Sequence, residues 1–189
     1  MKITDRTKNL AVSGEHTAMI VNADGSREEK DMPIVKEHFI DLIINEQLAA
    51  KLVCTPSNLQ EMIIGRMTAE GYIQSMEDVE SLYICEYGSK AKVFLNGKTE
   101  LVKTIENEPT CCTGNQVFLA NVKGDHLKRL EPAEWKVEWI FNLANAFASE
   151  SRIHRSTKGT HCCYLGIGNE VLYAAEDIGR HNAMDKAIG

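Results

Sequence analysis

The densest group of polar side chains in this chain lies near its end, in the stretch AAEDIGRHNAMDKAIG. Arginine can donate two parallel N–H bonds to a phosphate or carboxylate, acidic side chains accept bonds from amino or hydroxyl groups, and histidine can move a proton. Such a set can wall a pocket for a large polar anion, or it can satisfy itself as a buried network of ion pairs. Side-chain chemistry alone leaves both readings open. The residues are Glu176, Asp177, Arg180, His181, Asn182, Asp185 and Lys186.

The elements around this group predict that it sits where a strand ends and a helix begins. Two apolar arms flank Gly168-Asn169, a pair typical of a hairpin turn, and the second arm runs directly into the polar residues. We expect Asn182 to cap a short final helix whose Met184, Ala187 and Ile188 face inward. Gly179 would let the backbone approach a ligand closely, and Arg180 at the helix start would favour an anion. Junctions of this kind often bind ligands in α/β folds.

Cysteines form a second group with possible chemistry. Cys111 and Cys112 lie in ENEPTCCTGNQ, which reads as a loop because a proline and a glycine interrupt any regular element. A thiol that attacks or carries a group must be exposed, mobile and partly ionised. Such a loop provides the first two properties, and no neighbouring residue provides the third. An inert surface thiol and a vicinal disulfide are the alternatives. Cys162 and Cys163 lie in a strand-like arm, so alternation sends them to opposite faces and at least one into the core.

Composition excludes several classes of protein. The chain has 189 residues, 43% hydrophobic and 25% charged, and so can form one domain or two small ones. Its net charge of -6 argues against broad binding to nucleic acid or an anionic membrane. No apolar run approaches the ~20 residues of a membrane span, and the first residues show no secretion signal, so we expect a cytoplasmic protein. The sequence contains no Cys-x-x-Cys, which removes zinc ribbons and thioredoxin-type motifs.

The first helix is predicted within TPSNLQEMIIGRMTAEGYI. Thr55 can cap it with Pro56 at its first position, while Ser57 and Gln60 offer a competing capping box. Gly71 can end it in the left-handed conformation. One face of this helix is apolar and should lie on the core, namely Leu59, Met62, Ile63 and Met67.

Two hairpins and a second long helix complete the expected elements. Turns are predicted at Asp24-Gly25 and Asn96-Gly97. The second helix should open at Pro132 and carry a core-facing stripe in which apolar residues recur every four positions, at Trp135, Trp139, Leu143 and Phe147.

Together these segments resemble the formate dehydrogenase accessory protein family (FdhD). The similarity covers roughly Val35 to Gly189 and rests on four blocks in the family's order. They are EHFIDLIINEQ, CTPSNLQEMIIGRMTAEGYI, STKGTHCCYLG and AEDIGRHNAMDKAIG, the last of which is similar to the family signature almost residue for residue.

The resemblance implies a sulfurtransferase. Members receive sulfur from a cysteine desulfurase as a cysteine persulfide and pass it to the molybdenum (or tungsten) bis-guanine dinucleotide cofactor that formate dehydrogenase needs. Aligning Gly114 with the family's loop glycine favours Cys112 as the carrier, with Cys111 second, although the family's second loop cysteine is missing. The resemblance assigns the cofactor pocket to His161, Glu176, Asp177, Gly179, Arg180, His181, Asn182, Asp185 and Lys186, and implies no metal bound by the protein itself.

The same resemblance implies an α/β fold in two parts. A strand-rich part, residues 1–128, would hold one helix and the cysteine loop, and residues 129–189 would form a cytidine-deaminase-like half-core. Family members continue past the position of Gly189, so by this comparison the half-core is incomplete. A zinc deaminase would need His-x-Glu and Pro-Cys-x-x-Cys, whereas this chain has His181-Asn182-Ala183, which disfavours zinc hydrolysis.

We therefore expect a sulfur-carrying accessory protein whose partners are a cysteine desulfurase and formate dehydrogenase, without nucleic acid or membrane. Two alternatives stay open: a non-catalytic chaperone that binds the molybdenum cofactor, and a cysteine-based redox or metal sensor. By the same comparison, absence of the family's C-terminal segment would expose core surface, which suggests a homodimer.

Overall fold

The structure is a computed structural model that describes residues 1–97, 105–107, 116–118, 131–132 and 134–189. Within these ranges the strands are β1 (Lys2–Asp5), β2 (Ser13–Val21), β3 (Arg27–Val35), β4 (His38–Ile44), β5 (Gln47–Cys54), β6 (Val79–Ile84), β7 (Lys90–Leu95), β8 (Ile105–Asn107), β9 (Gln116–Phe118), β10 (His161–Ile167) and β11 (Glu170–Asp177). The helices are α1 (Leu59–Ala69), η1 (Met76–Asp78), α2 (Val137–Glu150), α3 (Arg152–Thr157) and α4 (Arg180–Ile188). The fold is thus mixed α/β and rich in strands.

A seven-stranded sheet forms the base of the molecule, in the order β1-β6-β7-β4-β5-β9-β8. Its centre is built from β4 and β5, which pair antiparallel through a tight turn at Asn45 and Glu46. Both turn residues have positive φ, 46° and 66°, as a two-residue hairpin turn requires. β4 pairs in parallel with β7, and β1 pairs in parallel with β6 at one edge.

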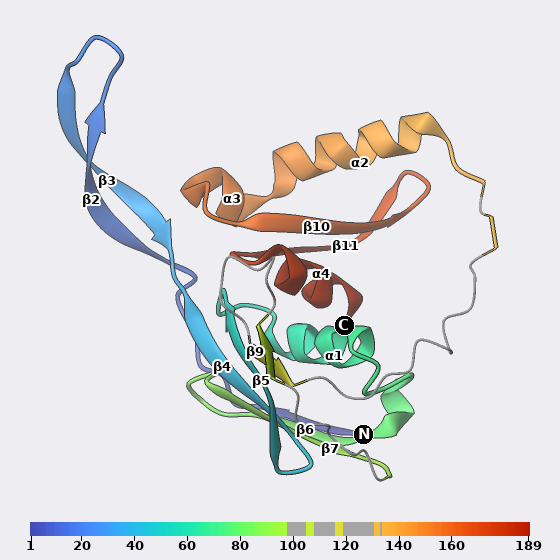
Figure 1. Ribbon diagram of the computed structural model, residues 1–189. Helices are drawn as coiled ribbons and strands as arrows, with labels where there is room; N and C mark the ends of the chain where they lie inside the picture. Colours follow the sequence, from blue (N-terminus) through green and yellow to red (C-terminus); the bar gives the residue numbers. More distant parts are fainter. Residues whose placement is uncertain (98–104, 108–115, 119–130, 133) are drawn as a thin grey trace.

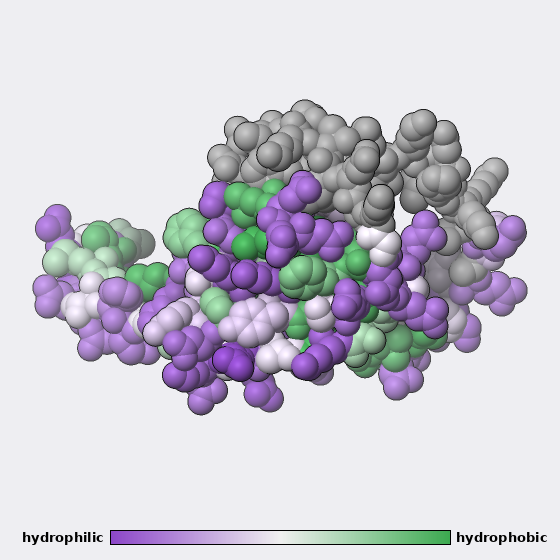
Figure 2. All heavy atoms as spheres, turned by 90° about the horizontal axis from the view of Figure 1, so that it is seen from below, coloured by the Kyte–Doolittle hydropathy of each residue, from purple (hydrophilic) through white to green (hydrophobic). Residues whose placement is uncertain are grey.

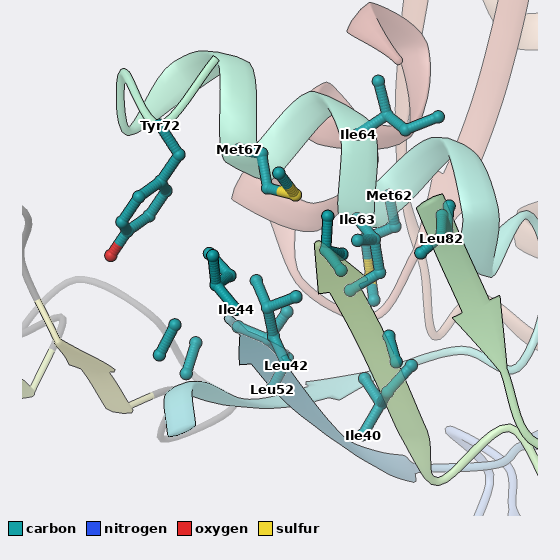
Figure 3. Packing of buried hydrophobic residues seen from close by; sticks show 14 of the residues in the cluster. Ile40, Leu42, Ile44, Leu52, Met62, Ile63, Ile64, Met67, Tyr72 and Leu82 are labelled. Atoms are coloured by element: carbon teal, nitrogen blue, oxygen red, sulfur yellow. The ribbon is translucent and has the colours of Figure 1, made fainter. Parts of the chain in front are cut away.

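Helix α1 lies on one face of this sheet and forms the main core with it (Figure 3). Met62, Ile63 and Met67 are fully or almost fully buried, as the apolar stripe predicts. They pack over every second side chain along the strands, those that point to the same face of the sheet. Among these are Leu42, Ile44, Leu52 and Leu82. The helix ends at Ala69, and Gly71 follows with φ +73°, so the predicted left-handed glycine is confirmed.

Helix α4 packs directly on α1, and the two backbones approach unusually closely. A Cβ on Gly65 would lie 1.8 Å from the carbonyl oxygen of Asp185, and one on Gly189 would lie 2.0 Å from that of Glu61. Arg66 of α1 also reaches across to Asp185, Nε to Oδ2 3.1 Å, and to Glu70 on its own helix. Contact at this distance is possible only because position 65 has no side chain.

Above α4 lies the hairpin of β10 and β11, and above the hairpin lies α2, so the layers follow one another from sheet to α2 (Figure 1). The predicted turn at Gly168-Asn169 is confirmed, with Gly168 at φ +61°. Helix α2 touches the hairpin with Trp139 and Leu143, and the Phe147 ring stands 5.4 Å from that of Tyr164. Among the described residues, α2 has no buried side chain.

The hairpin of β2 and β3 extends away from this layered body (Figure 1). It forms a two-stranded sheet of its own, with constant register from Ser13↔Val35 to Val21↔Arg27. The predicted Asp24-Gly25 turn closes its far end, where Gly25 has φ +83°. We call β2, β3 and this turn the arm.

Two predicted helix starts were wrong, and at α1 a long-range contact prevailed over the local signal, because Thr55 bonds to Asp177 and not to the helix. α1 begins at Leu59 after Asn58, without a side-chain cap from Thr55 or Ser57. α2 begins at Val137, five residues after Pro132, and leaves Trp135 exposed before it.

The last helix also departs from its prediction. α4 starts at Arg180 after Gly179, so Asn182 lies within it and does not cap it. Met184 and Ile188 are 53% and 51% exposed, whereas Ala183 and Ala187 are the apolar side chains that face inward.

Two further predictions fall on undescribed residues. The second arm of the Asn96-Gly97 hairpin is one, and the boundary between residues 128 and 129 is the other. The two-part division therefore stays a prediction, and the contact between α1 and α4 joins the two parts.

Substitution of Gly65 by alanine tests the close helix contact. Alanine favours a helix over glycine by about 1 kcal/mol, so an uncrowded site would be stabilised. Here the new methyl would meet the Asp185 carbonyl, and we expect the unfolding free energy to fall by about 2 kcal/mol in urea titration. Thr68→Ala, at an exposed position of the same helix, should change it by less than about 0.5 kcal/mol. A Gly65→Ala protein at least as stable as the parent would contradict the contact.

Candidate functional site

A buried ion pair lies at the centre of the polar group. Lys186 Nζ stands 2.7 Å from Asp177 Oδ2, and both side chains are 0% exposed. Removing two charges from water is costly unless each finds other partners. Lys186 finds them in Thr55, donating to its carbonyl oxygen (3.1 Å) and to its hydroxyl (2.8 Å). It also lies 3.4 Å from Ser57 Oγ and 3.3 Å from the Glu176 carbonyl oxygen.

Asp177 is satisfied just as completely. Its Oδ2 accepts from the Thr55 backbone N–H (2.9 Å) and the Thr55 hydroxyl (3.0 Å). Its Oδ1 accepts from the Gly179 N–H (2.8 Å) and from the Asn182 side chain (3.0 Å). Asn182 in turn donates to the Val53 carbonyl oxygen at 2.7 Å. We call Thr55, Asp177, Asn182 and Lys186 the buried network.

The buried network joins segments that are far apart in sequence. Thr55 follows β5 and precedes α1, Asp177 ends β11, and Asn182 and Lys186 belong to α4. The hydrogen bonds that the Asp177 carboxylate accepts therefore fix the turn between β11 and α4. Arg180 and His181 project from this turn. Thr55 was predicted only as a helix cap, and its part in this network was missed.

Two predicted residues stand at the outer side of that turn. Arg180, the first residue of α4, is exposed, and His181 beside it is half-buried. His161, the first residue of β10, is exposed and lies opposite Asp177 in the strand register. The structure thus brings Arg180, His181 and His161 to one end of the hairpin. Asp185, in contrast, is buried and pairs with Arg66.

Glu176 holds the start of α3. Its carboxylate accepts from the backbone N–H of Ile153 (3.0 Å) and of His154 (2.6 Å), and from the Thr160 hydroxyl (3.1 Å). The Cys162 thiol lies 3.7 Å away. Two backbone donors at the first turn of a helix are the usual partners of a capping carboxylate, so Glu176 positions the segment that carries α3.

A pocket of about 250 Å³ opens between the start of α1 and the hairpin. Asn58, in the left-handed conformation at φ 49°, forms part of its wall, and its amide donates to the Tyr173 hydroxyl at 2.9 Å. The wall adjoins the buried network, because Ser57 belongs to the pocket and contacts Lys186. Sequence reasoning placed only one of the lining residues in the site; they are Ser57, Asn58, Glu150, Arg152, Ile153, Tyr164, Ala174, Ala175 and Glu176.

The described cysteines differ in their environments. The pKa of Cys54 is raised to about 12, mainly by burial and also by the Asp177 charge, while the Lys186 charge acts against both. Cys162 and Cys163 are half-buried, and burial raises the pKa of each. At Cys85 burial also acts to raise the pKa, but hydrogen bonds from Ser89 and from backbone N–H groups outweigh it and leave the pKa lowered. Cys111 and Cys112 lie outside the described residues.

Metal-binding groups and membrane-spanning helices are both absent from the described residues. No group of three or more His, Cys, Asp or Glu side chains in these ranges is placed to hold a metal ion. In the same part of the chain, none of the helices has both the length and the apolar character to cross a membrane.

Lys186→Met tests the buried network. The change would leave Asp177 buried without its cation, and removal of one partner of a buried pair typically costs 3–5 kcal/mol, so we expect the unfolding free energy to fall by about 3 kcal/mol. Lys8→Met, which breaks the exposed pair with Glu86, should cost less than about 1 kcal/mol. Equal effects of the two changes in denaturant titration would contradict the role of the network.

Known proteins are similar to the chain over most of its length. The sulfur carrier protein FdhD of Listeria monocytogenes serotype 4b is 29% identical over 171 residues, which cover 87% of this chain and 66% of that protein. The sulfur carrier protein FdhD of Shouchella clausii is 31% identical over 172 residues, covering 84% and 62%. The chain thus spans somewhat less than two thirds of the length of these curated relatives.

A solved structure shares the fold. It is that of a protein from Desulfotalea psychrophila assigned as a formate dehydrogenase accessory protein, with a TM-score of 0.65 at 19% identity, covering 93% of this chain and 65% of that one. At that identity the likeness concerns the fold alone.

A family model matches the chain as well. The model of the FdhD/NarQ family matches residues 35–189, which include the cysteine loop, the buried network and the residues around the pocket. This chain therefore belongs to the FdhD/NarQ family.

Proposed function

We propose that this protein is a sulfurtransferase that carries persulfide sulfur from a cysteine desulfurase to the molybdenum (or tungsten) bis-guanine dinucleotide cofactor of formate dehydrogenase. The observation that carries the proposal is the family match over residues 35–189. The relatives named sulfur carrier protein FdhD support the same activity. The cofactor is the substrate here, and formate dehydrogenase and the desulfurase are the proposed partners.

The sulfur carrier in this proposal is Cys112, with Cys111 second. In the loading step the Cys112 thiolate attacks the outer sulfur of the desulfurase persulfide. The S–S bond of that persulfide breaks, the desulfurase cysteine leaves as a thiolate, and a new S–S bond forms at Cys112. One sulfur atom moves without net oxidation or reduction, so no further reagent is needed.

The cofactor would bind at the end of the hairpin where β11 meets α4. Its guanine dinucleotide portions are polyanionic, and exposed basic side chains gather at this end although the chain as a whole carries -6. In this proposal Arg180 and His161 face phosphate groups, and the buried network keeps both at fixed positions. The exposed basic and imidazole residues are Arg152, Arg155, Lys158, His161 and Arg180.

The fold supports the deaminase-like part of the proposal. Helix α2, strands β10 and β11, and helix α4 follow one another in the order expected for the first half of a cytidine-deaminase-like core, with the short α3 between α2 and β10. We propose that residues 129–189 form this half-core on a strand-rich part of residues 1–128.

Persulfide loading tests the activity directly. After incubation with a cysteine desulfurase and free cysteine, intact-protein mass should rise by one sulfur atom, and peptide mapping should place it on Cys112 or Cys111. The added mass should disappear on reduction and in the corresponding alanine variant.

Cys54 provides the internal control, because a buried thiol with a pKa of about 12 should take up no sulfur. A folded protein that binds the cofactor but accepts no sulfur would support the second candidate instead, a non-catalytic cofactor chaperone. The pocket beside the buried network favours that candidate, since it can serve binding whether or not a cysteine reacts.

Arg180→Ala tests the anion site. Loss of a charge-assisted bond should weaken binding of GDP, a fragment of the cofactor, by about tenfold or more in calorimetric titration. Lys8→Ala, which removes an exposed cation near Glu86, should leave the affinity unchanged. Equal affinity of parent and Arg180→Ala would refute the assignment of Arg180.

A further inference from the structure

Helices α1, α4, α2 and α3 all lie on the same side of the seven-stranded sheet (Figure 1). Side chains alternate along a strand, so Leu42 and Ile44 of β4 point to α1, whereas Phe39 and Ile43 point to the opposite face. Figure 2 looks from below, at the side where β6 and β7 lie in Figure 1, and shows hydrophobic and hydrophilic side chains interspersed. We call this the open face of the sheet. Its residues include Phe39, Ile43, Lys51, Lys90, Lys92 and Phe94.

Apolar groups are exposed on the open face. The Phe39 ring is 66% exposed and the Phe94 ring 37%. A hollow of about 190 Å³ opens beside Phe94. Exposed aromatic rings next to a hollow that accepts a partner's side chain are typical of the residues that dominate binding between proteins. The residues that line the hollow are Ile43, Glu46, Lys92, Val93 and Phe94.

Cations outnumber carboxylates on the described part of the open face. The Arg6 guanidinium stands 5.8 Å from the centre of the Tyr83 ring, which shares this face because Tyr83 lies opposite Lys92 in the register. Asp41 is neutralised by Lys51 at 3.0 Å, and Glu46 lies at the hollow. On a chain whose net charge is -6, this surface is locally positive and complements an acidic one. Its exposed cations are Arg6, Lys51, Lys90 and Lys92.

The strand register leads from the open face to the segment that carries the proposed sulfur carriers. Lys51 pairs with Gln116 of β9, and Gln116 pairs with Asn107 of β8. The chain between Asn107 and Gln116 contains both loop cysteines. In the other direction Lys51 pairs with Asp41, and Asp41 with Lys90. At ~4.8 Å between strands, Lys90 lies about 14 Å from Gln116 along this one row.

We infer that the open face is the docking surface for the protein that donates the sulfur, and that it binds an acidic surface of that donor. This inference rests on the proposed function. A donor must bring its persulfide to the segment between Asn107 and Gln116, and the basic row begins one strand away from Gln116. The hollow takes an apolar side chain, which a protein supplies and a nucleic acid does not.

The same inference separates the two partners in space. The proposed cofactor site at Arg180 lies beyond α1 and α4, on the side of the sheet opposite the open face (Figure 1). Donor and cofactor can therefore bind together, and neither should weaken the affinity of the other.

Lys92→Glu tests the charge of the open face. Lys92 is suited because its direct neighbours across the strands, Tyr83 and Ile43, carry no charge, so the variant should fold normally. Its dissociation constant for the cysteine desulfurase that loads the parent should rise about tenfold at low salt, and the difference should shrink at about 0.5 M salt. The desulfurase concentration for half-maximal loading should rise with it, while the maximal loading rate should stay the same. Lys136→Glu, an equal charge change at an exposed position before α2, should alter neither quantity.

Phe39→Ala tests the apolar contact. Removal of the exposed ring should weaken desulfurase binding by about tenfold. Phe141→Ala on α2 is the matched control, because its ring is 65% exposed and lies on the other side of the molecule. That variant should bind the desulfurase as the parent does.

The outcomes separate this inference from the proposed function. A parent that is loaded with sulfur, together with Lys92→Glu and Phe39→Ala variants that keep the parent's affinity for the desulfurase, would overturn the inference and leave the function standing. A parent that no desulfurase loads would overturn both. GDP affinity and sedimentation should be the same in the parent and Lys92→Glu, and a single-stranded RNA 20-mer should bind neither. A change in GDP affinity, in oligomeric state or in RNA binding without a change in desulfurase affinity would assign the face to another occupant and overturn the inference.

Discussion

The ion pair between Lys186 and Asp177 is the interaction on which the rest of the site depends. Both groups are excluded from water, so their charges are tolerated only while Thr55, Gly179 and Asn182 hold their hydrogen bonds. A displacement of any one segment would leave a buried charge short of partners. That penalty gives the junction of β5, β11 and α4 a single arrangement, and Arg180 projects from it.

Close helix packing provides the second constraint. Because Gly65 lets α1 approach the Asp185 carbonyl, α4 lies low enough for Lys186 to reach Thr55 at the start of α1. The apolar core below α1 and the polar network beside it are thus two results of one helix position. The pocket follows from both, since Ser57 and Asn58 come directly after Thr55 and form one of its walls.

Local patterns in the sequence predicted elements well and junctions poorly. The apolar stripe of α1, the turns at Asp24-Gly25 and Gly168-Asn169, and the strand leading to Asp177 all follow from periodicity or turn chemistry within a few residues. Thr55 and Asn182 carry equally clear cap signals, but bonds to partners 122 and 129 residues away determine their roles. The polar group at residues 176–186 was recognised, yet only the fold could separate its buried members from exposed Arg180.

The position of α4 in the chain has a consequence for the order of folding. The large sheet and α1 consist mainly of contacts within the first hundred residues and can form early during synthesis. The contacts of Thr55 with Asp177 and of Gly65 with Asp185, however, can form only after residues 177–186 have been synthesised. The face of α1 that packs on α4 therefore stays exposed to solvent through most of translation. Closing so long a loop for a polar contact is entropically expensive, which makes docking of α4 a late step, at which the nascent protein is open to chaperones or proteases.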